Sequence, residues 1–512
     1  MTRNRTNLFP IAGMAATRSR ADEPFYIHED VSTEDAEMTQ DGDLNTEEAE
    51  DEDADEADEA DEADDQDDES SDSSDEADTI EPGVQRDMAK LQSSIPGFSE
   101  KYTLLKRIGE GAYWPARLRV QANQPGTFST VYKALDLHYD RYVNDWDSEQ
   151  KQDAKWTPPP LSRFTSRSSS THTLDDASQS RPAAKRRFVA IKKIYVTSSP
   201  QRIFNELELL YALRSCPSVC PIITAFRHDD QVIAILPYFR HDDFRTYFRN
   251  MQVDDMRIYL RELFLALRGV HEEHILHRDI KPTNFLYHPE SRRGVLVDFG
   301  LAERAGVDAK PCLCHEAYEV RKHKLANSVA AQAGPQQGYP KTDTRPSRRA
   351  NRAGTRGFRA PEVLFKCTEQ TTAIDVWSAG VILLTILSKR FPFFNSADDV
   401  EAMVEIATIF GSRRMKAAGQ LHGCMFETSI PTIGRDGFTF EKIIMWSTCR
   451  DAKNQPLTRD EKLAIEFLGR CMDLDPARRI TAKEALEHEF LRLPGEKPLD
   501  VSDDDEIDML QA

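Results

Sequence analysis

The chain has 512 residues, a formal net charge of −21 and 8 cysteines, which are scattered without framework spacing and so indicate a reduced cytosolic or nuclear compartment. Between Asp22 and Glu81 it holds 31 acidic residues and no lysine or arginine, so the remainder carries about +10. The longest apolar run, Val381 to Leu387, is too short to span a membrane, and the N-terminus lacks a secretory hydrophobic segment.

Residues 1–98 are predicted to form a disordered acidic tail. Ala-Asp-Glu repeats such as those in 54–64 have too few apolar groups to offset chain entropy. Residues 1–21 contain arginines and no acid, a pattern that faintly resembles a transit peptide but fits a basic disordered end better. Later in the tail, Ser71 and Ser74 directly precede acidic residues.

A glycine-rich turn of the kind that covers a phosphate is predicted after the tail. Ile108-Gly109-Glu110-Gly111 starts it, and the pattern resumes after an interruption to reach Val131, which we expect under an adenine. The interrupting residues 112–126 include Trp114 and Pro115, which do not suit a nucleotide-covering hairpin. Because the flanks join in frame, we interpret 112–126 as an unspliced intron in the gene model. The alternative is a genuine insertion that weakens nucleotide binding.

Residues 136–187 form a polar insert rich in proline, serine and threonine. A strand is predicted from Phe188 to Ile194, and it carries Ala190 and Lys192 in a Val-Ala-Ile-Lys context. Lys192 is expected to contact the α- and β-phosphates of a nucleotide. Glu206, on an amphipathic helix, is its candidate ion-pair partner. The alternative reading of Glu206 is an exposed helix-face residue, since Glu208 lies close by.

A buried strand is predicted from Val232 to Phe239. It contains Leu236, and it leads into a hinge at Tyr238 and Phe239 whose backbone groups we expect to meet the adenine edge. A helix is predicted to follow from Asp255 to His271.

The chemistry is predicted to centre on residues 277–300. Asp279 is the candidate for orienting a substrate hydroxyl and accepting its proton, and Lys281 can screen the transferred phosphoryl group. Asn284 and Asp298 are candidate magnesium ligands. The apolar runs around Phe285 and Val295 predict a hairpin that holds these loops rigidly.

A second insert, residues 304–353, precedes a segment from Gly354 to Glu362, and Arg479 is the expected buried partner of Glu362. From Lys341 to Arg359 there are seven basic residues and one aspartate. Thr355, Arg356 and Arg359 are therefore candidate substrate contacts, with guanidinium groups that favour a carboxylate or phosphate after the target residue. The alternative is a merely solvated basic insert.

Cys312, Cys314 and His315 form a Cys-x-Cys-His sequence within the second insert, with His323 nearby. This pattern suggests a zinc site completed by ligands from elsewhere in the chain. It falls below the usual paired-cysteine standard, so free thiols are the alternative reading.

These motifs resemble the eukaryotic protein kinase family over roughly residues 101–492. Three stretches, 195–203, 281–287 and 357–367, resemble most closely the cell-division-cycle-seven-related kinases, the catalytic subunits of the DDK complex. The resemblance implies an α+β fold with a β-rich N-terminal lobe, a helical C-terminal lobe and ATP with Mg²⁺ between them. It also implies a nuclear serine/threonine kinase that needs a regulatory subunit and phosphorylates the minichromosome maintenance helicase to fire replication origins.

The predicted organisation is therefore an acidic tail (1–98), a kinase domain with its inserts (99–495) and an acidic C-terminal tail (496–512). No direct contact with nucleic acid or membrane is expected. Two other classes remain open, a pseudokinase scaffold and an acid-directed kinase of different biology, such as a casein-kinase-like enzyme.

Overall fold

The computed structural model describes residues 28–29, 81–111, 129–141, 187–195, 199–216, 218–229, 231–306, 310–327, 351–451 and 453–493. The predicted interruption at 112–126, serines 70–74 and the C-terminal tail lie outside these residues. Two compact units are present, a β-rich one around residues 79–200 and 221–238 and a helical one around 201–220 and from 239 onward. They match the expected β-rich and helical lobes and confirm the α+β class. None of the described helices is long and apolar enough to cross a membrane.

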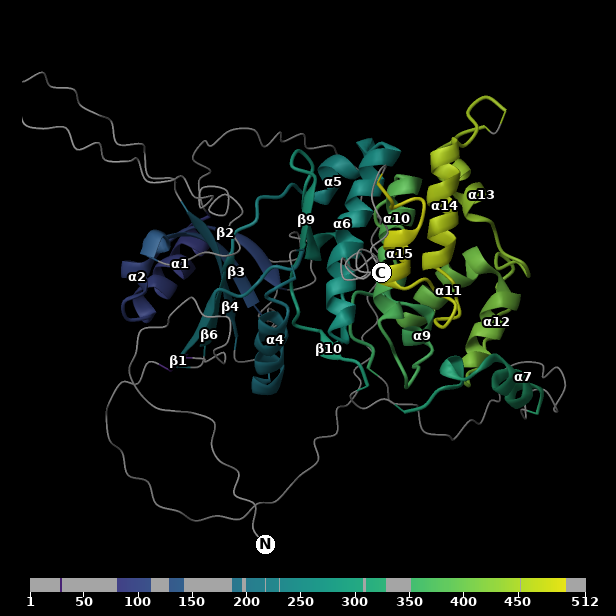
Figure 1. Cartoon of the computed structure of the whole chain (residues 1–512), viewed down its shortest axis with the longest axis horizontal. Coiled ribbons are helices and arrows are strands. Elements are labelled where there is room, and N and C mark those ends of the chain that lie inside the picture. Colours follow the sequence, from purple (N-terminus) through teal and green to yellow (C-terminus); the bar gives the residue numbers. More distant parts are fainter. Residues whose placement is uncertain are drawn as a thin grey trace, which may run out of the picture. The chain divides into compact units, whose positions relative to one another are not determined.

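The β-rich unit is built on a six-stranded sheet with strand order β1-β5-β6-β4-β3-β2 (Figure 1). All neighbours pair antiparallel except β1 and β5, which run parallel. The strand predicted from Phe188 to Ile194 is β4, with the same bounds. The other strands are β1 (His28–Glu29), β2 (Tyr102–Gly111), β3 (Ser129–Asp136), β5 (Thr224–His228) and β6 (Gln231–Pro237).

A helix that the sequence did not lead us to expect packs onto this sheet. Helix α1 (Pro82–Ser94) is followed by the short α2 (Phe98–Lys101), and both lie beside the strands in Figure 1. Val84, Met88 and Leu91 of α1 are buried in one core with sheet residues such as Ile191. The prediction of a disordered tail through residue 98 is therefore wrong for residues 82–98. The apolar residues recur at helical spacing there, and burial against the sheet stabilises the helix.

The helical unit is organised around α10 (Ala373–Ser388), in which every residue from Ile374 to Ser388 is buried. The predicted helix before the catalytic stretch is α6 (Val253–Glu272), which contacts α10, α14 and α15. The other helices of more than three residues among the described residues are α4 (Pro200–Ala212), α5 (Phe244–Tyr247), α7 (Tyr318–Ala326), α9 (Pro361–Leu364), α11 (Asp399–Phe410), α12 (Ser412–Leu421), α13 (Phe440–Ser447), α14 (Arg459–Cys471) and α15 (Ala482–Glu487).

Two short strand pairs of the helical unit frame the catalytic stretch. Strand β7 (Ile275–Leu276) pairs with β10 (Glu303–Arg304), and β8 (Phe285–His288) pairs antiparallel with β9 (Arg293–Leu296). The hairpin predicted from the apolar runs is thus confirmed. Because residues 277–284 run from β7 into β8, the catalytic loop is fixed at both ends.

Candidate active site

The carboxylate of Asp279 is the centre of a group of four side chains in the helical unit. Its Oδ1 accepts hydrogen bonds from the Thr355 backbone N–H at 3.0 Å and from the Thr355 hydroxyl at 2.6 Å. Its Oδ2 lies 2.8 Å from Lys281 Nζ and accepts from Asn284 Nδ2 at 3.0 Å. Lys281 also donates to the Thr355 hydroxyl at 3.0 Å. The structure thus brings together four residues that the sequence singled out from two separate motifs.

Buried Asp375, in the first turn of α10, anchors the catalytic loop through hydrogen bonds to its backbone. Its carboxylate accepts the backbone N–H groups of His277 and Arg278 at 2.9 and 2.8 Å, and it lies 3.0 Å from His271 Nε2. Burial alone would raise the pKa of Asp375. The hydrogen bond with His271, the electrostatic effect of His271 and His277 and the backbone N–H of His277 together outweigh it and hold that pKa below its usual value. This role of Asp375 could not be predicted from the sequence, because its partners lie 97 to 104 positions away along the chain.

The carboxylates of Asp298 and Glu206 both lie near Gly300, which follows the hairpin. A Cβ atom placed on Gly300 would be 3.4 Å from Asp298 Oδ1 and 3.5 Å from Glu206 Oε2, so both carboxylates border this glycine. Helix α4 is tied to the same segment because Asn205 donates from Nδ2 to the Ala302 carbonyl at 2.8 Å. Asp298 adopts a φ of 66°, an uncommon left-handed conformation for a residue other than glycine.

The predicted nucleotide residues of the β-rich unit fall in register across its sheet. Gly109 pairs with Val131, and Val131 pairs with Lys192. Ala190 pairs with Leu236, and alternation along β4 puts Ala190 and Lys192 on one face. Ile108 precedes Gly109, and Gly111 ends β2.

The hinge role of Tyr238 and Phe239 and the ion pair between Lys192 and Glu206 remain predictions. The ring of Tyr238 packs edge-on against Phe188, and Lys133 Nζ lies 4.5 Å from its centre; Phe239 follows in the chain. Lys192 and Glu206 are both buried, and they belong to different units. Their proposed ion pair therefore remains a prediction.

Three arginines flank Thr355, and one carboxylate bridges two of them. Asp399, in the first turn of α11, places Oδ1 2.5 Å from Arg359 Nη1 and Oδ2 3.1 Å from Arg352 Nη1. Arg359 also donates from Nε to the Gly354 carbonyl at 2.8 Å, and exposed Arg356 donates to the Ala397 carbonyl. Burial lowers the pKa of Arg359, while Asp399 acts in the opposite direction.

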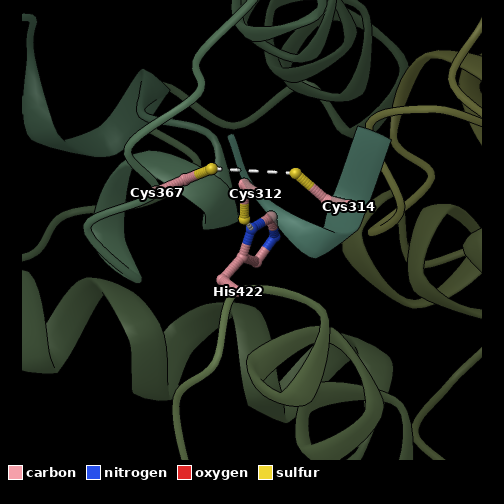
Figure 2. A group of neighbouring side chains, drawn as sticks. All are labelled: Cys312, Cys314, Cys367 and His422. Carbon is pink, nitrogen blue, oxygen red and sulfur yellow. Dashed lines mark hydrogen bonds between the residues drawn. The ribbon is translucent and has the colours of Figure 1, made fainter. Parts of the chain in front are cut away.

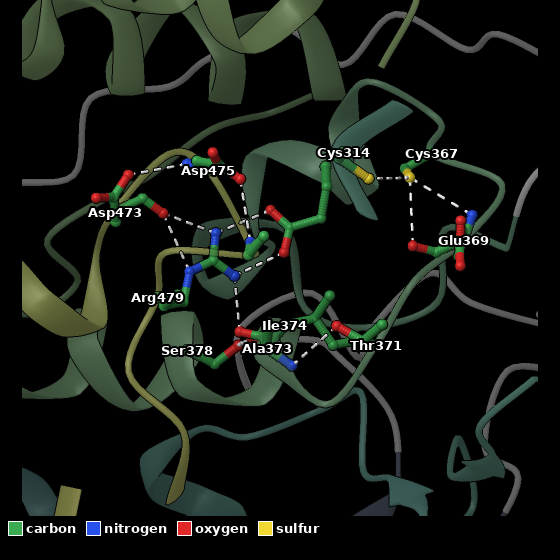
Figure 3. A network of polar contacts seen from close by, with 12 residues as sticks. Cys314, Cys367, Glu369, Thr371, Ala373, Ile374, Ser378, Asp473, Asp475 and Arg479 are labelled. Atoms are coloured by element: carbon green, nitrogen blue, oxygen red, sulfur yellow. Dashed lines mark hydrogen bonds and ion pairs between the residues drawn. The ribbon is translucent and has the colours of Figure 1, made fainter. Parts of the chain in front are cut away.

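The expected buried partner of Glu362 is confirmed. Arg479 donates from Nη1 and Nη2 to the two oxygens of Glu362 at 2.6 and 3.0 Å, and both side chains are almost completely buried. Arg479 also donates to the carbonyl groups of Asp473 and Ala373, as Figure 3 shows. This network ties the segment after Arg359 to the end of the helical unit.

The candidate zinc ligands occupy a buried cluster of different composition from the one predicted (Figure 2). The ligand atoms of Cys312, Cys314, Cys367 and His422 all lie within 4.8 Å of one another. His315 is not among them, because its Nε2 lies 3.2 Å from the Glu369 carbonyl oxygen. The histidine of the cluster is thus His422 and not the predicted His315. Cys367 was not predicted as a ligand, because it stands at the end of the stretch 357–367 without a second cysteine or histidine beside it.

Comparisons with known proteins place these motifs in a family. The protein kinase domain family matches residues 176–322 and 336–491. The chain is 45% identical to the cell cycle serine/threonine-protein kinase hsk1 of Schizosaccharomyces pombe, over 77% of this chain and 73% of hsk1. It is 38% identical to the cell cycle protein kinase spo4 of the same yeast, over 80% and 89% of the two chains. It is 25% identical to the human cell division cycle 7-related protein kinase, over 80% and 93%.

Proposed function

The chain belongs to the protein kinase family, within it to the cell division cycle 7-related serine/threonine kinases, and we propose that it phosphorylates the replicative helicase to trigger origin firing. Serine/threonine kinase activity and a cell cycle role are common to this family. The helicase substrate, the nuclear location and a dedicated activating subunit of the DDK type are the parts that we propose.

The observation that carries the kinase reading is the set of contacts at Asp279. A carboxylate whose oxygens meet a lysine ammonium, an amide and a threonine hydroxyl is suited to orienting a second hydroxyl and accepting its proton. Lys281, which reaches both Asp279 and Thr355, supplies a positive charge where the transferred phosphoryl group carries negative charge. The site therefore supports transfer of a phosphoryl group to a serine or threonine hydroxyl.

ATP and Mg²⁺ are the cofactors of protein kinase domains, and the residues present fit them. Asn284 and Asp298 offer amide and carboxylate oxygens, the hard ligands that Mg²⁺ prefers. We assign to them the metal, which neutralises charge on the phosphates when bound. Lys192 is assigned to the α- and β-phosphates, with Glu206 as its partner. Ile108, Gly109, Gly111, Val131, Ala190, Leu236, Tyr238 and Phe239 are assigned to the nucleotide.

We propose that substrates carry an acidic or phosphorylated residue directly after the target serine or threonine. Arg356 is exposed, and Arg359 is joined through Gly354 to Thr355, which itself contacts Asp279. Guanidinium groups on the segment that contacts the catalytic carboxylate favour an anion beside the target residue. Ser71 and Ser74 of the acidic tail would then be sites of self-phosphorylation.

The test of this function is reconstitution. The full chain, alone and with its co-purifying subunit, is incubated with ATP, Mg²⁺ and assembled helicase subunits, and phosphorylated sites are mapped by mass spectrometry. We expect transfer to serines in acidic context, and strong dependence on the added subunit. Full activity without any partner would favour the casein-kinase-like reading instead. Absence of any phosphoryl transfer in a single-turnover assay would favour the pseudokinase reading, which the presence of Lys192, Asp279, Asn284 and Asp298 disfavours.

We also propose that zinc binds to Cys312, Cys314, Cys367 and His422. Two sulfur ligands of a tetrahedral zinc ion lie about 3.8 Å apart, given a Zn–S bond of about 2.3 Å. The Cys314 and Cys367 sulfurs are 3.7 Å apart, and Cys312 Sγ is 3.8 Å from His422 Nδ1. Three cysteines and one histidine form a common structural zinc set, and burial of all four suits a closed site.

The site would join three separate segments of the helical unit. Cys312 and Cys314 come from the second insert, Cys367 follows α9, and His422 ends α12. The backbone N–H of Cys367 donates to the Glu362 carbonyl at 2.8 Å, so the metal would brace the region next to the buried Glu362 side chain. Figure 3 shows Cys314 and Cys367 near this network.

Metal analysis of the purified full chain tests the zinc proposal. We expect one zinc per chain, and loss of that zinc in Cys367→Ser and His422→Ala. His315→Ala and the exposed Cys449→Ser serve as matched controls and should keep it. Substitution by Co²⁺ should give the absorption of a tetrahedral thiolate site. Stoichiometric zinc that survives His422→Ala but not His315→Ala would reverse the ligand assignment. Absence of zinc would refute the site and leave three free thiols beside a histidine.

A further inference from the structure

The carboxylate of Asp399 contacts two of the arginines that flank Thr355. Its two oxygens are divided between two guanidinium groups, Oδ1 facing Arg359 and Oδ2 facing Arg352. The side chain of Asp399 is 22% exposed, that of Arg359 16% and that of Arg352 44%. All three charged groups are therefore partly accessible to solvent.

The neighbouring acidic residues of α11 are engaged elsewhere. Asp398 caps the helix by accepting the Glu401 backbone N–H at 2.7 Å. Glu401 accepts the Ala397 N–H at 2.6 Å, and Glu405 accepts from Asn395 and Ser396. Asp399 is therefore the acidic residue of this turn whose carboxylate faces the arginines.

The arginines repel one another and need a counter-charge to stay together. The positive charges of Arg356 and Arg352 both act to lower the pKa of Arg359, so Arg359 is repelled by both of the other guanidinium groups. A single carboxylate shared by Arg352 and Arg359 offsets this repulsion and fixes both planes. Within the described residues, Nη2 of each of these two arginines makes no hydrogen bond, so both still have donors to offer.

From this arrangement we propose that Asp399 is a positioning residue that holds Arg352 and Arg359 as a clamp for an anionic group on the substrate. The proposal rests on the acid-directed specificity proposed above and assigns its control to a residue forty positions further along the chain. The clamp reaches the reacting centre through Arg359 Nε, which binds the Gly354 carbonyl immediately before Thr355. A phosphate monoester fits best, because its three terminal oxygens can meet donors from both guanidinium groups at once.

The experiment compares three peptides that differ only in the residue after the target serine: phosphoserine, aspartate or alanine. Steady-state kcat/KM is measured with the active complex of the full chain for wild type, Asp399→Asn, Asp399→Glu and Asp398→Ser. Asp398→Ser is the matched control, because it removes one negative charge from the same turn while serine retains the capping oxygen.

We expect Asp399→Asn to lower the phosphoserine-to-alanine ratio of kcat/KM by about tenfold, the size of one charge-assisted hydrogen bond lost. The loss should appear mainly in KM for the phosphoserine peptide, while the alanine peptide changes little. Asp399→Glu should restore part of the ratio, and Asp398→Ser should keep it.

Two results would overturn the positioning role while leaving acid-directed specificity intact. One is a high wild-type ratio that Asp399→Asn leaves unchanged. The other is a ratio that rises in Asp399→Asn, which would make Asp399 a competing anion rather than a support. A wild-type ratio near one would instead remove the acid-directed specificity itself, and the role of Asp399 with it.

Discussion

Gly354 lies directly against the backbone of Arg278. A Cβ atom added to this glycine would be 2.3 Å from the Arg278 carbonyl oxygen, and its φ of 111° is rarely adopted by other residues. Arg278 itself is fixed by hydrogen bonds to Gln370 and Glu303, and its φ is 69°. The contact brings the segment that contains Thr355 against the catalytic loop. There is no room at Gly354 for a Cβ atom between the two segments.

Gly354→Ala is therefore expected to lower activity strongly. The added methyl group must push Thr355 away from Asp279, and we expect kcat/KM on a protein substrate to fall by about two orders of magnitude. Gly306→Ala is a suitable control, since Gly306 also has a positive φ but no described residue within 4 Å of its Cβ position. Equal losses in both variants would show that backbone strain, rather than the contact with Arg278, causes the defect.

Asp279→Asn is expected to lower phosphoryl transfer by orders of magnitude while leaving ATP binding nearly intact. Asparagine can still bond with Thr355, but it cannot accept the substrate proton. Lys192→Ala should instead weaken nucleotide positioning. Turnover on a peptide and binding of a fluorescent ATP analogue measure the two effects separately. Near-full turnover in Asp279→Asn would refute the role that we assign to this carboxylate.

Arg479→Met is expected to destabilise the protein by about 3–5 kcal/mol, because it leaves Glu362 charged and unpaired in the interior. Denaturant unfolding measures the change. Arg478→Met, which removes an exposed arginine next in the chain, should cost far less. If the two variants proved equally stable, the buried pair would contribute nothing specific.

The same pair predicts a pH dependence of stability. Burial opposes ionisation of Glu362, but Arg479 outweighs it and holds the pKa of Glu362 below its ordinary value of 4.5. The unfolded state therefore takes up a proton first as the pH falls, and stability from this pair decreases from about pH 4.5 downward. In Glu362→Gln this contribution to the pH dependence should disappear, as measured by unfolding at a series of pH values.

Leu91→Ala is expected to cost about 2–5 kcal/mol, because Leu91 of α1 is 1% exposed in the core of the β-rich unit. Gln85→Ala, on the exposed side of the same helix, should leave stability almost unchanged. Thermal unfolding of the full chain compares the two. Matching stability of both variants would return residues 82–98 to the disordered tail that the sequence suggested.

The sequence by itself determined the features that depend on contiguous residues. The residues of the catalytic stretch lie within 24 positions, from His277 to Gly300, and local backbone geometry is enough to bring Asp279 and Asn284 together. The strand that carries Lys192 could be read from its apolar run. The Glu362–Arg479 pair could be expected because each residue belongs to a recognisable sequence motif.

Only the tertiary structure decided the contacts between distant residues that no motif announces. His422 joins Cys312 across 110 positions, and Asp399 joins Arg359 across 40, because helix packing sets which side chains meet. Helix α1 could not be predicted from the sequence for a related reason. Its few apolar residues gain stability only once the sheet covers them, and the acidic composition of the preceding segment outweighed that weak periodic signal.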